Sequence, residues 1–426
     1  MVKELKHTEI GDIPVDWELQ TFDETFRVIS NNTLSRENLN NRGGAVRNIH
    51  YGDILTKFPE ILDCNEEEIP YVNELSLLSS STQLLQDGDI VVADTAEDET
   101  VGKVIEVQNL GDSKLVAGLH TIPCRVKKGD FAPGWLGYYM NSDLFHNQIL
   151  PYITGIKVSS ISKGAISETL ILVPPFDEQE KIVQSLNKIQ LLMTSETKVV
   201  NKIKLVKNGC LSKMFPQKDD TVPEMRLPGF TEAWEQRKLG DVCSRVQGND
   251  GRMELPTLTI SASNGWMKQE DRFSGNIAGK EQKNYTLLHK GELSYNHGNS
   301  KLAKYGTVFS LQSYEEALVP RVYHSFKVEE GNTDFIEYYF ATKLPDRELG
   351  KLISSGARMD GLLNIGYKEF MGIQLLFPKT KEQECIANYF RNLDHLITLH
   401  QCKCDKYSNI KKGMMSDLLT GKIRLV

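Results

Sequence analysis

The chain has 426 residues, of which 40% are hydrophobic and 25% charged, and it carries a net charge of −7, an ordinary composition for a globular protein of two to four domains. No apolar run reaches the about 18 residues that a transmembrane helix needs, and residues 1–7 lack the apolar core of a signal peptide, so the expected location is the cytoplasm. Seven scattered cysteines are typical of a reducing compartment rather than a disulfide framework.

Residues 1–176 are predicted to form a first globular domain of mixed α/β structure. Short apolar runs at residues 89–93 and 101–107 have the length and the β-branched content of strands. The turn signal Gln-Asp-Gly-Asp at residues 86–89 leads into the first run. Another apolar run at residues 170–173 is expected to be the last strand of this domain.

Residues 177–215 are predicted to form a long helix. Its apolar residues recur at alternating spacings of four and three, which is the pattern of a coiled-coil seam. The seam consists of Ile182, Leu186, Ile189, Met193, Val200 and Ile203. A helix of about 38 residues is roughly 57 Å long, too long to bury its seam within one small domain. We therefore expect a second helix as its partner.

The rest of the chain repeats this plan. Residues 216–230 contain three prolines and are expected to be a linker, residues 231–378 a second mixed domain, and residues 379–426 a second helical region with a tail. The second seam consists of Ile386, Phe390, Leu393, Ile397, Cys404 and Tyr407. Glu196 and His400 interrupt the two seams at matching places. This match favours pairing of the two helices over two unrelated amphipathic helices that each pack on their own domain.

The two globular parts also match each other in order. The matched pairs are Trp17 and Trp234, residues 84–89 and 287–292, and residues 135–140 and 335–340. Between these anchors the two parts diverge. The predicted fold class is α+β, with two similar mixed α/β domains separated by two long helices that pair as an antiparallel coiled coil with approximate twofold symmetry.

This layout resembles the specificity subunit of type I restriction–modification systems. The resemblance is carried by residues 174–182, 222–242, 378–386 and 418–425. It implies a non-catalytic subunit whose two target-recognition domains each read one half of a divided, asymmetric double-stranded DNA target. It also implies that the helices set the unread gap and dock two copies of a DNA methyltransferase subunit, and that restriction and translocation subunits join the complex.

Patterns that mimic catalytic or metal sites fail in their details. The Val-Pro-Pro-Phe run at residues 173–176 resembles the Asn-Pro-Pro-Phe motif of DNA amino-methyltransferases, but Val173 cannot accept a hydrogen bond through its side chain. Residues 275–280 lack the spacing of a phosphate-binding loop. Cys402 and Cys404 lie on different faces of a predicted helix, which argues against a zinc site. We therefore expect no catalytic residue, no metal and no cofactor.

Candidate DNA contacts come from basic and amide-rich loops, because Arg and Lys pair with guanine and Asn and Gln with adenine. In the first domain the candidates are Arg47, Asn48, His50, Lys157 and Lys163. In the second domain they are Asn296, Asn299, Lys301, Lys304, Tyr305 and Arg358. The acidic residues 94–98 occupy the position that matches residues 296–300, so the two recognition surfaces are expected to differ.

The charge balance leaves an alternative open. Residues 1–216 hold 21 basic and 30 acidic residues, a net charge of −9, and the remainder carries +2. A DNA-binding protein of this balance must gather its basic residues on one face or rely on partner subunits for phosphate contacts. The alternative is a symmetric coiled-coil scaffold that binds only proteins. An autonomous enzyme is disfavoured by the motif details above.

Overall fold

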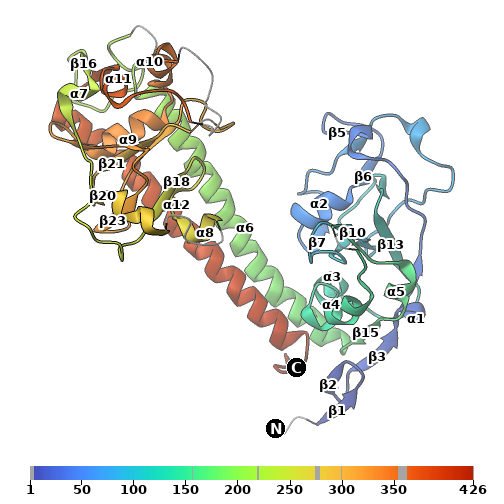
Figure 1. Ribbon diagram of the computed structural model, residues 1–426. Coiled ribbons are helices and arrows are strands. Elements are labelled where there is room, and N and C mark those ends of the chain that lie inside the picture. The colour runs from blue at the N-terminus through green and yellow to red at the C-terminus, as the bar shows by residue number, and fades with distance from the viewer. Residues whose placement is uncertain are drawn as a thin grey trace. The chain divides into compact units, whose positions relative to one another are not determined.

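The structure, a computed structural model, describes residues 4–155, 157–217, 220–273, 279–298, 300–353 and 362–425. The chain divides into two compact units. Unit 1 comprises Met1–Glu196 with Lys403–Val426, and unit 2 comprises Thr197–Cys402. The two long helices, α6 (Phe176–Lys213) and α12 (Thr380–Leu418), each contribute one part to each unit (Figure 1).

Unit 1 is built around a five-stranded sheet in the order β4-β13-β9-β11-β7, antiparallel except for the pair β11–β7. These strands are β4 (Phe26–Val28), β7 (Ile61–Asp63), β9 (Ile90–Ala93), β11 (Val104–Gln108) and β13 (Thr121–Val126). Strand β9 is buried along its whole length, and its alternate residues belong to two core clusters. Both faces of the sheet are therefore covered, which explains the unbroken apolar run in the sequence.

A second sheet of unit 1 has the order β12-β6-β8-β5. Its strands are β5 (Leu39–Asn40), β6 (Arg47–Ile49), β8 (Tyr71–Val72) and β12 (Leu115–Ala117). The short helices are α1 (Phe22–Thr25), η1 (Arg36–Asn38), α2 (Tyr51–Thr56), η2 (Leu75–Leu77), α3 (Trp135–Tyr139), α4 (Asp143–Ile149), η3 (Leu150–Tyr152) and α5 (Lys163–Ser167). The remaining strands are β1 (Leu5–Thr8), β2 (Gly11–Pro14), β3 (Glu18–Thr21), β10 (Thr95–Ala96), β14 (Ser159–Ser160) and β15 (Leu170–Val173).

Unit 2 contains an antiparallel four-stranded sheet in the order β17-β24-β21-β22. Its strands are β17 (Cys243–Arg245), β21 (Leu293–Asn296), β22 (Thr307–Ser310) and β24 (His324–Val328). The other strands are β16 (Glu235–Lys238), β18 (Leu258–Ser261), β19 (Gly265–Lys268), β20 (Thr286–His289), β23 (Glu316–Val319) and β25 (Gln374–Phe377). The short helices are α7 (Leu239–Val242), α8 (Gln269–Phe273), η4 (Gly279–Asn284), α9 (Thr333–Ala341), α10 (Asp346–Lys351) and α11 (Tyr367–Met371).

Both units join their globular part to a long helix in the same way. In unit 1 the strand that leads into α6, β15, pairs antiparallel with β3. In unit 2 the strand that leads into α12, β25, pairs antiparallel with β16. A buried tryptophan lies beside each pair, and Trp17 meets Trp135 edge-on as Trp234 meets Phe335. The predicted repeat is therefore a repeat of packing as well as of sequence.

The two long helices pair antiparallel, with the same polar contact in each unit. In unit 1, Lys411 Nζ donates to Gln190 Oε1 at 2.8 Å. In unit 2, Lys207 Nζ donates to Asp394 Oδ1 at 2.5 Å. Both members of the second contact lie 204 positions from their counterparts in the first, the same offset that relates the two polar seam positions. The predicted antiparallel coiled coil is confirmed.

All predicted seam residues are buried or half-buried in the helix pair. Glu196, the polar interruption of the first seam, lies 3.6 Å from Lys403 of α12. The interruption is therefore matched by a basic residue across the seam.

Among the described residues, no helix is both long enough and apolar enough to cross a membrane.

In each unit a buried glutamate links a strand of the globular part to a short helix. The glutamate lies on the strand in unit 1 and on the helix in unit 2. In unit 1, Glu106 on β11 accepts hydrogen bonds from Gly134 N at 2.5 Å and Gly137 N at 2.8 Å at the start of α3. In unit 2, Glu337 on α9 accepts from the backbone N–H and the hydroxyl of Ser310 on β22. Burial raises the pKa of both carboxyls, and the backbone hydrogen bonds oppose that shift.

Candidate nucleic-acid interface

The two units build the same arrangement where a central strand ends. In unit 1, residues that follow β9 pair with β14 through β10, and Asp94 O accepts a hydrogen bond from Ile161 N at 2.9 Å. In unit 2, the segment after β21 pairs with Leu362 through Gly298, and His297 O accepts from Leu363 N at 2.9 Å. Segments far apart in the sequence thus meet at equivalent places in both units.

A tight turn lies against each strand end. In unit 1 it is residues 118–120, between β12 and β13, and Asp94 N donates to His120 O at 3.1 Å. In unit 2 it is residues 320–323, between β23 and β24, and His297 Nε2 lies 3.0 Å from Val322 O. Strand register aligns Asp94 with His297, one residue later than the sequence match of residues 94–98 with 296–300, and aligns His120 with Val322. The frame is shared, while the side chains that it presents are different.

The turn of unit 1 holds His120 in a strained backbone conformation. Its φ is +56°, in the left-handed region that non-glycine residues rarely adopt. The ring Nδ1 lies 3.2 Å from Thr95 Oγ1 and 3.4 Å from an oxygen of Asp94. Tyr51 packs edge-on against the ring, with 5.3 Å between ring centroids. These contacts orient the imidazole, which is nevertheless exposed.

Two of the predicted residues of the first domain lie in the interior. Arg47 is buried on β6 and donates to Cys64 O at 2.6 Å. Asn48 is fully buried and accepts a hydrogen bond from Asn32 Nδ2 at 2.7 Å. Both side chains are therefore used within the fold and do not reach the surface.

The other predicted residues of the first domain lie nearer the strand end. His50 caps helix α2, where its Nδ1 accepts from Gly52 N at 3.1 Å, and burial lowers the pKa of its imidazole. Its ring contacts Tyr51, the neighbour of His120. Lys157 and Lys163 are exposed on either side of β14. The two lysines flank, in the sequence, the strand that pairs with β10.

The predicted residues of the second domain divide in a similar way. Asn296 is half-buried, donating to Ile260 O at 3.2 Å and accepting from Gly298 N at 3.0 Å. The backbone oxygen of Tyr305 accepts from Tyr295 Oη at 2.7 Å. Both are engaged within the fold. The exposed candidates are Lys301 and Lys304. Asn299 and Arg358 lie outside the described residues.

A surface cleft of about 630 Å³ lies beside Asn296, and sequence reasoning missed its basic residues. Arg272 reaches into its wall and donates to Ile260 O at 2.8 Å. Arg321 and Val322, on the tight turn, are exposed at its edge. The signal in the sequence was the Pro-Arg-Val turn between two apolar runs, but only the structure shows that it lies beside the predicted loop.

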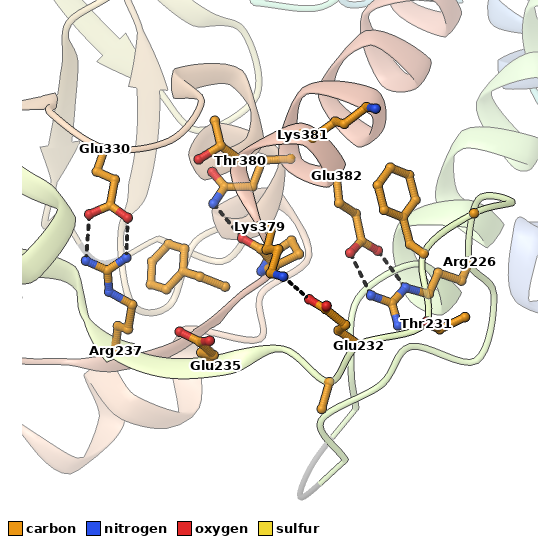
Figure 2. Close-up of a pocket in the computed structure, with 16 residues that line it drawn as sticks. Arg226, Thr231, Glu232, Glu235, Arg237, Glu330, Lys379, Thr380, Lys381 and Glu382 are labelled. Atoms are coloured by element: carbon orange, nitrogen blue, oxygen red, sulfur yellow. Dashed lines mark hydrogen bonds and ion pairs between the residues drawn. The ribbon is translucent and has the colours of Figure 1, made fainter.

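The joint between the globular part and the long helix also forms a cleft in unit 2, of about 430 Å³ (Figure 2). Arg226 donates two hydrogen bonds of 2.7 Å to Glu382 near the start of α12. A second bidentate pair joins Arg237 to Glu330. Arg226 and Arg237 are each matched by a carboxylate, as is Lys379 by Glu232. These ion pairs indicate that the cleft holds the joint together.

The joint of unit 1 uses the equivalent glutamate. Arg424, in the C-terminal tail, donates to Glu178 on α6 and to Asp16 beside Trp17. Trp17 Nε1 also donates to Glu178 at 2.9 Å. Although burial opposes the shift, hydrogen bonds from Arg424 and Trp17 hold the pKa of Glu178 below its ordinary value of 4.5. Arg424 likewise lowers the pKa of Asp16.

No metal-binding group of three or more His, Cys, Asp and Glu side chains occurs within the part of the chain that the structure describes. The surfaces at the strand ends instead carry exposed lysine, arginine and histidine side chains on short, anchored segments. Such side chains suit hydrogen bonding to base edges and phosphates.

The sequence of the chain is similar to those of known proteins. Residues 14–205 match the family model described as the type I restriction modification DNA specificity domain. The chain is 23% identical to the putative type I restriction enzyme MjaX specificity subunit of Methanocaldococcus jannaschii, covering 99% of this chain and 96% of that protein. It is 22% identical to the MjaVIII specificity subunit of the same organism over 64% of this chain and 66% of that protein.

Solved structures share the fold across nearly the whole chain. The type I restriction–modification S subunit from M. genitalium matches with a TM-score of 0.54 at 12% identity, covering 98% of this chain and 99% of that one. A chain from a study of complex assembly and conformational transition in a type I system matches with a TM-score of 0.53 at 13% identity, covering 96% and 99%. At these identities the likeness concerns the fold.

Proposed function

We propose that each unit of this chain reads one half of a divided, asymmetric double-stranded DNA target. The premise is that the chain belongs to the specificity-subunit family of type I restriction–modification systems. The chain itself has no active site in this proposal. Methyl transfer, DNA translocation and cleavage belong to partner subunits in the cytoplasm. The proposed domain limits are residues 1–176 and 231–378 for the two readers, and 177–215 and 379–426 for the helical regions, with a linker at 216–230.

The observation that carries this proposal is the pair of equivalent strand ends with unlike side chains. At both strand ends a backbone oxygen, of Asp94 or of His297, accepts a hydrogen bond from a distant segment. The adjacent turn is contacted by the backbone N–H of Asp94 in unit 1 and by the side chain of His297 in unit 2. The turn beside them presents His120 in one unit, and Arg321 and Val322 in the other. One frame with two different surfaces is what recognition of two different half-sites requires, whereas a symmetric protein scaffold has no need of the difference.

The proposed role of the paired helices is to hold the two readers apart by a fixed gap. Half-sites on one face of B-DNA lie about 34 Å apart per helical turn. Helices of 38 and 39 residues are each roughly 57 Å long, which is long enough to span that separation. Deleting one heptad from α6 is therefore expected to change the accepted gap or to abolish binding, while each globular part stays folded.

The helices also offer matched docking positions for two copies of a methyltransferase subunit. Leu192 and Ile410 are 44% and 38% exposed in unit 1, and Val206 and Leu396 are 45% and 40% exposed in unit 2. The 204-residue offset relates Leu192 to Leu396 and Val206 to Ile410. Each unit thus exposes the same two apolar positions, which suits two identical partners.

Introducing a negative charge on the helices tests this docking. Leu192→Glu with Leu396→Glu is expected to weaken co-purification of the methyltransferase subunit, because a carboxylate would be buried in an apolar contact. Leu75→Glu is the matched control, since Leu75 is an exposed leucine of the globular part. Equal loss in the control and the double variant would contradict docking on the helices.

The decisive experiment measures binding of the assembled complex with its methyltransferase to a library of random duplexes. The expected result is enrichment of two short half-sites separated by a constant gap, with affinity that falls as salt rises. Methylome sequencing of a host that carries both subunits reports the same target independently. If the complex shows no preference among duplexes, the specificity proposal is wrong and a protein-binding scaffold is the better description.

Loop variants then test the proposed contacts. Lys301→Ala and Arg358→Ala are expected to weaken DNA binding without disturbing subunit assembly. Lys157→Ala and Lys163→Ala are expected to act in the same way through unit 1, because all four residues are proposed to contact phosphates or base edges. Arg47 and Asn48 remain in the proposal as residues that shape the surface from beneath, through the buried contacts of β6.

A further inference from the structure

The tight turns at residues 118–120 and 320–323 share three features. Each lies against the end of a central strand, each is anchored by hydrogen bonds, and each presents an exposed side chain at its tip. They occupy equivalent places in two units whose loops have otherwise diverged.

The anchoring makes the turn of unit 1 rigid. Asn31 Nδ2 donates to Gly118 O at 3.2 Å and to Thr121 O at 2.9 Å. Thr121 Oγ1 donates to Gly118 O at 2.6 Å. The tip residue is His120, whose left-handed backbone is maintained against its steric cost.

The turn of unit 2 is anchored by different residues to the same end. Tyr323 N donates to Pro320 O at 3.0 Å. The Tyr323 hydroxyl lies 3.0 Å from Thr259 Oγ1 and accepts from Ile260 N at 3.3 Å. Because both backbone and side chain of Tyr323 are fixed, the adjacent Arg321 and Val322 extend from a rigid base.

We propose that these two turns are the main base-reading elements of the chain, with His120 the specificity-determining residue of unit 1 and Arg321 and Val322 those of unit 2. This inference rests on the proposed function and assigns it to particular side chains. An anchored side chain loses less conformational freedom on binding than a free loop residue, so it discriminates between bases more sharply.

The chemistry of each tip suits a base edge. Thr95 Oγ1 donates to an oxygen of Asp94 at 2.7 Å, which leaves its lone pair to accept from Nδ1–H of His120. With Nδ1 as the donor, Nε2 of the neutral ring is left as an acceptor, which suits the amino group of adenine or cytosine. In unit 2 the guanidinium of Arg321 suits the two acceptors of guanine, and the exposed side chain of Val322 suits the methyl group of thymine.

The exposed lysines have a different part in this scheme. Lys157 and Lys163 in unit 1, and Lys301 and Lys304 in unit 2, are exposed side chains with long flexible stems, and the ammonium group of Lys304 lies 5.3 Å from the ring centroid of Tyr305. They suit phosphate contacts, which add affinity equally for every sequence. The turns and the lysines therefore make opposite predictions for target preference.

The test uses the full chain assembled with its methyltransferase and compares target profiles from a random duplex library. His120→Gly removes the imidazole, and glycine accepts a φ of +56° without strain, so folding is retained. We expect this variant to lose roughly tenfold or more of the preference at one or two positions of one half-site, the effect of a typical single base-pair change. Arg321→Ala is expected to relax the other half-site only.

Two controls separate the possible outcomes. His7→Ala removes another exposed histidine, paired with Asp12 at 2.8 Å on a strand outside the turns, and is expected to leave both half-sites unchanged. Lys163→Ala is expected to weaken binding uniformly with the profile intact. If the unaltered complex selects a target and His120→Gly and Arg321→Ala select the same one with unchanged sharpness, this inference is overturned. If the unaltered complex selects none, the proposed function fails instead.

Discussion

The joint of each unit pairs an arginine with a glutamate near the start of a long helix. The hydrogen bonds of the arginine and of the neighbouring tryptophan differ between the two units. In unit 1, Arg424 meets both Glu178 and Asp16, and Trp17 donates to Glu178. In unit 2, Arg226 meets Glu382 through Nε and Nη2. There the buried Nη1 of Arg226 and the buried indole N–H of Trp234 have no hydrogen-bond partner among the described residues.

One sequence difference explains the unmatched Nη1 of Arg226, whereas the unmatched indole N–H of Trp234 has no such explanation. Ala233 precedes Trp234 in the sequence, where Asp16 precedes Trp17. The carboxylate that would face Nη1 is therefore absent from unit 2. The ion pair between an arginine and the glutamate near the start of the long helix is present in both units. The contact of the arginine with a second carboxylate is present only in unit 1 among the described residues. Four predictions test this comparison.

The largest effect is expected from removing the shared glutamate of unit 1. Glu178→Ala leaves Arg424 and Trp17 with buried, unmatched donors, so the loss of stability is expected to be about 3–5 kcal/mol. Urea unfolding followed by tryptophan fluorescence measures it. Glu180→Ala, an exposed neighbour on the same helix, is expected to change stability by less than about 0.5 kcal/mol. Similar losses for both substitutions would show that the joint is not the cause.

Acid is expected to weaken the same joint gradually. Because the folded pKa of Glu178 lies below its ordinary value of 4.5, its contribution is complete above that ordinary value. It is lost as the pH falls through the lowered pKa. The stability difference between the unaltered chain and Glu178→Gln should therefore shrink between pH 7 and about pH 3. A difference that stays constant over this range would contradict a carboxylate role.

An intermediate effect is expected at the helix pair, and it should differ between units. Lys411 is 8% exposed and reaches both Glu60 and Gln190, so Lys411→Ala is expected to cost about 2 kcal/mol. Lys207 and Asp394 are 21% and 39% exposed, and Lys207→Ala is expected to cost about 1 kcal/mol. Thermal unfolding of the two variants gives the comparison. A larger loss for Lys207→Ala would reverse our ranking of the two contacts.

The smallest effect is a gain. Ala233→Asp places a carboxylate opposite Arg226 Nη1, as Asp16 lies opposite Arg424. Satisfying one buried donor is expected to raise stability by about 1 kcal/mol. The reciprocal change, Asp16→Ala, is expected to lower it by a similar amount. If Ala233→Asp destabilises the chain, the unmatched Nη1 is not explained by the missing carboxylate.

Sequence reasoning was strongest where structure depends on residues close together in the chain. The seam spacing predicted both long helices, which begin and end within a few residues of the predicted bounds. The repeat predicted an antiparallel helix pair, and the matched positions of Glu196 and His400 favoured pairing; the contacts of Lys207 and Lys411 confirm both. Helical periodicity is a local property, so it survives without knowledge of the tertiary fold.

The predicted DNA contacts were weaker because exposure is decided by strand pairing. Arg47 and Asn48 are polar residues in a basic segment, yet β6 lies between β12 and β8 and buries them. His120 and Arg321 were not predicted at all. Their importance comes from turns that meet distant strand ends, at Asp94 and His297, and no spacing in the sequence reports that meeting.

The sequence by itself therefore determined the repeat, the two helices and the polar interruptions of their seams. Each of these features follows from a pattern of residues within one segment or between two similar segments. Only the tertiary structure decided which polar side chains are exposed, which turn faces each strand end, and why one joint is complete while the other lacks a carboxylate. These depend on contacts between segments that are not neighbours in the chain, from Asp94 with His120 to Glu178 with Arg424. Their pairing follows from packing of the whole unit.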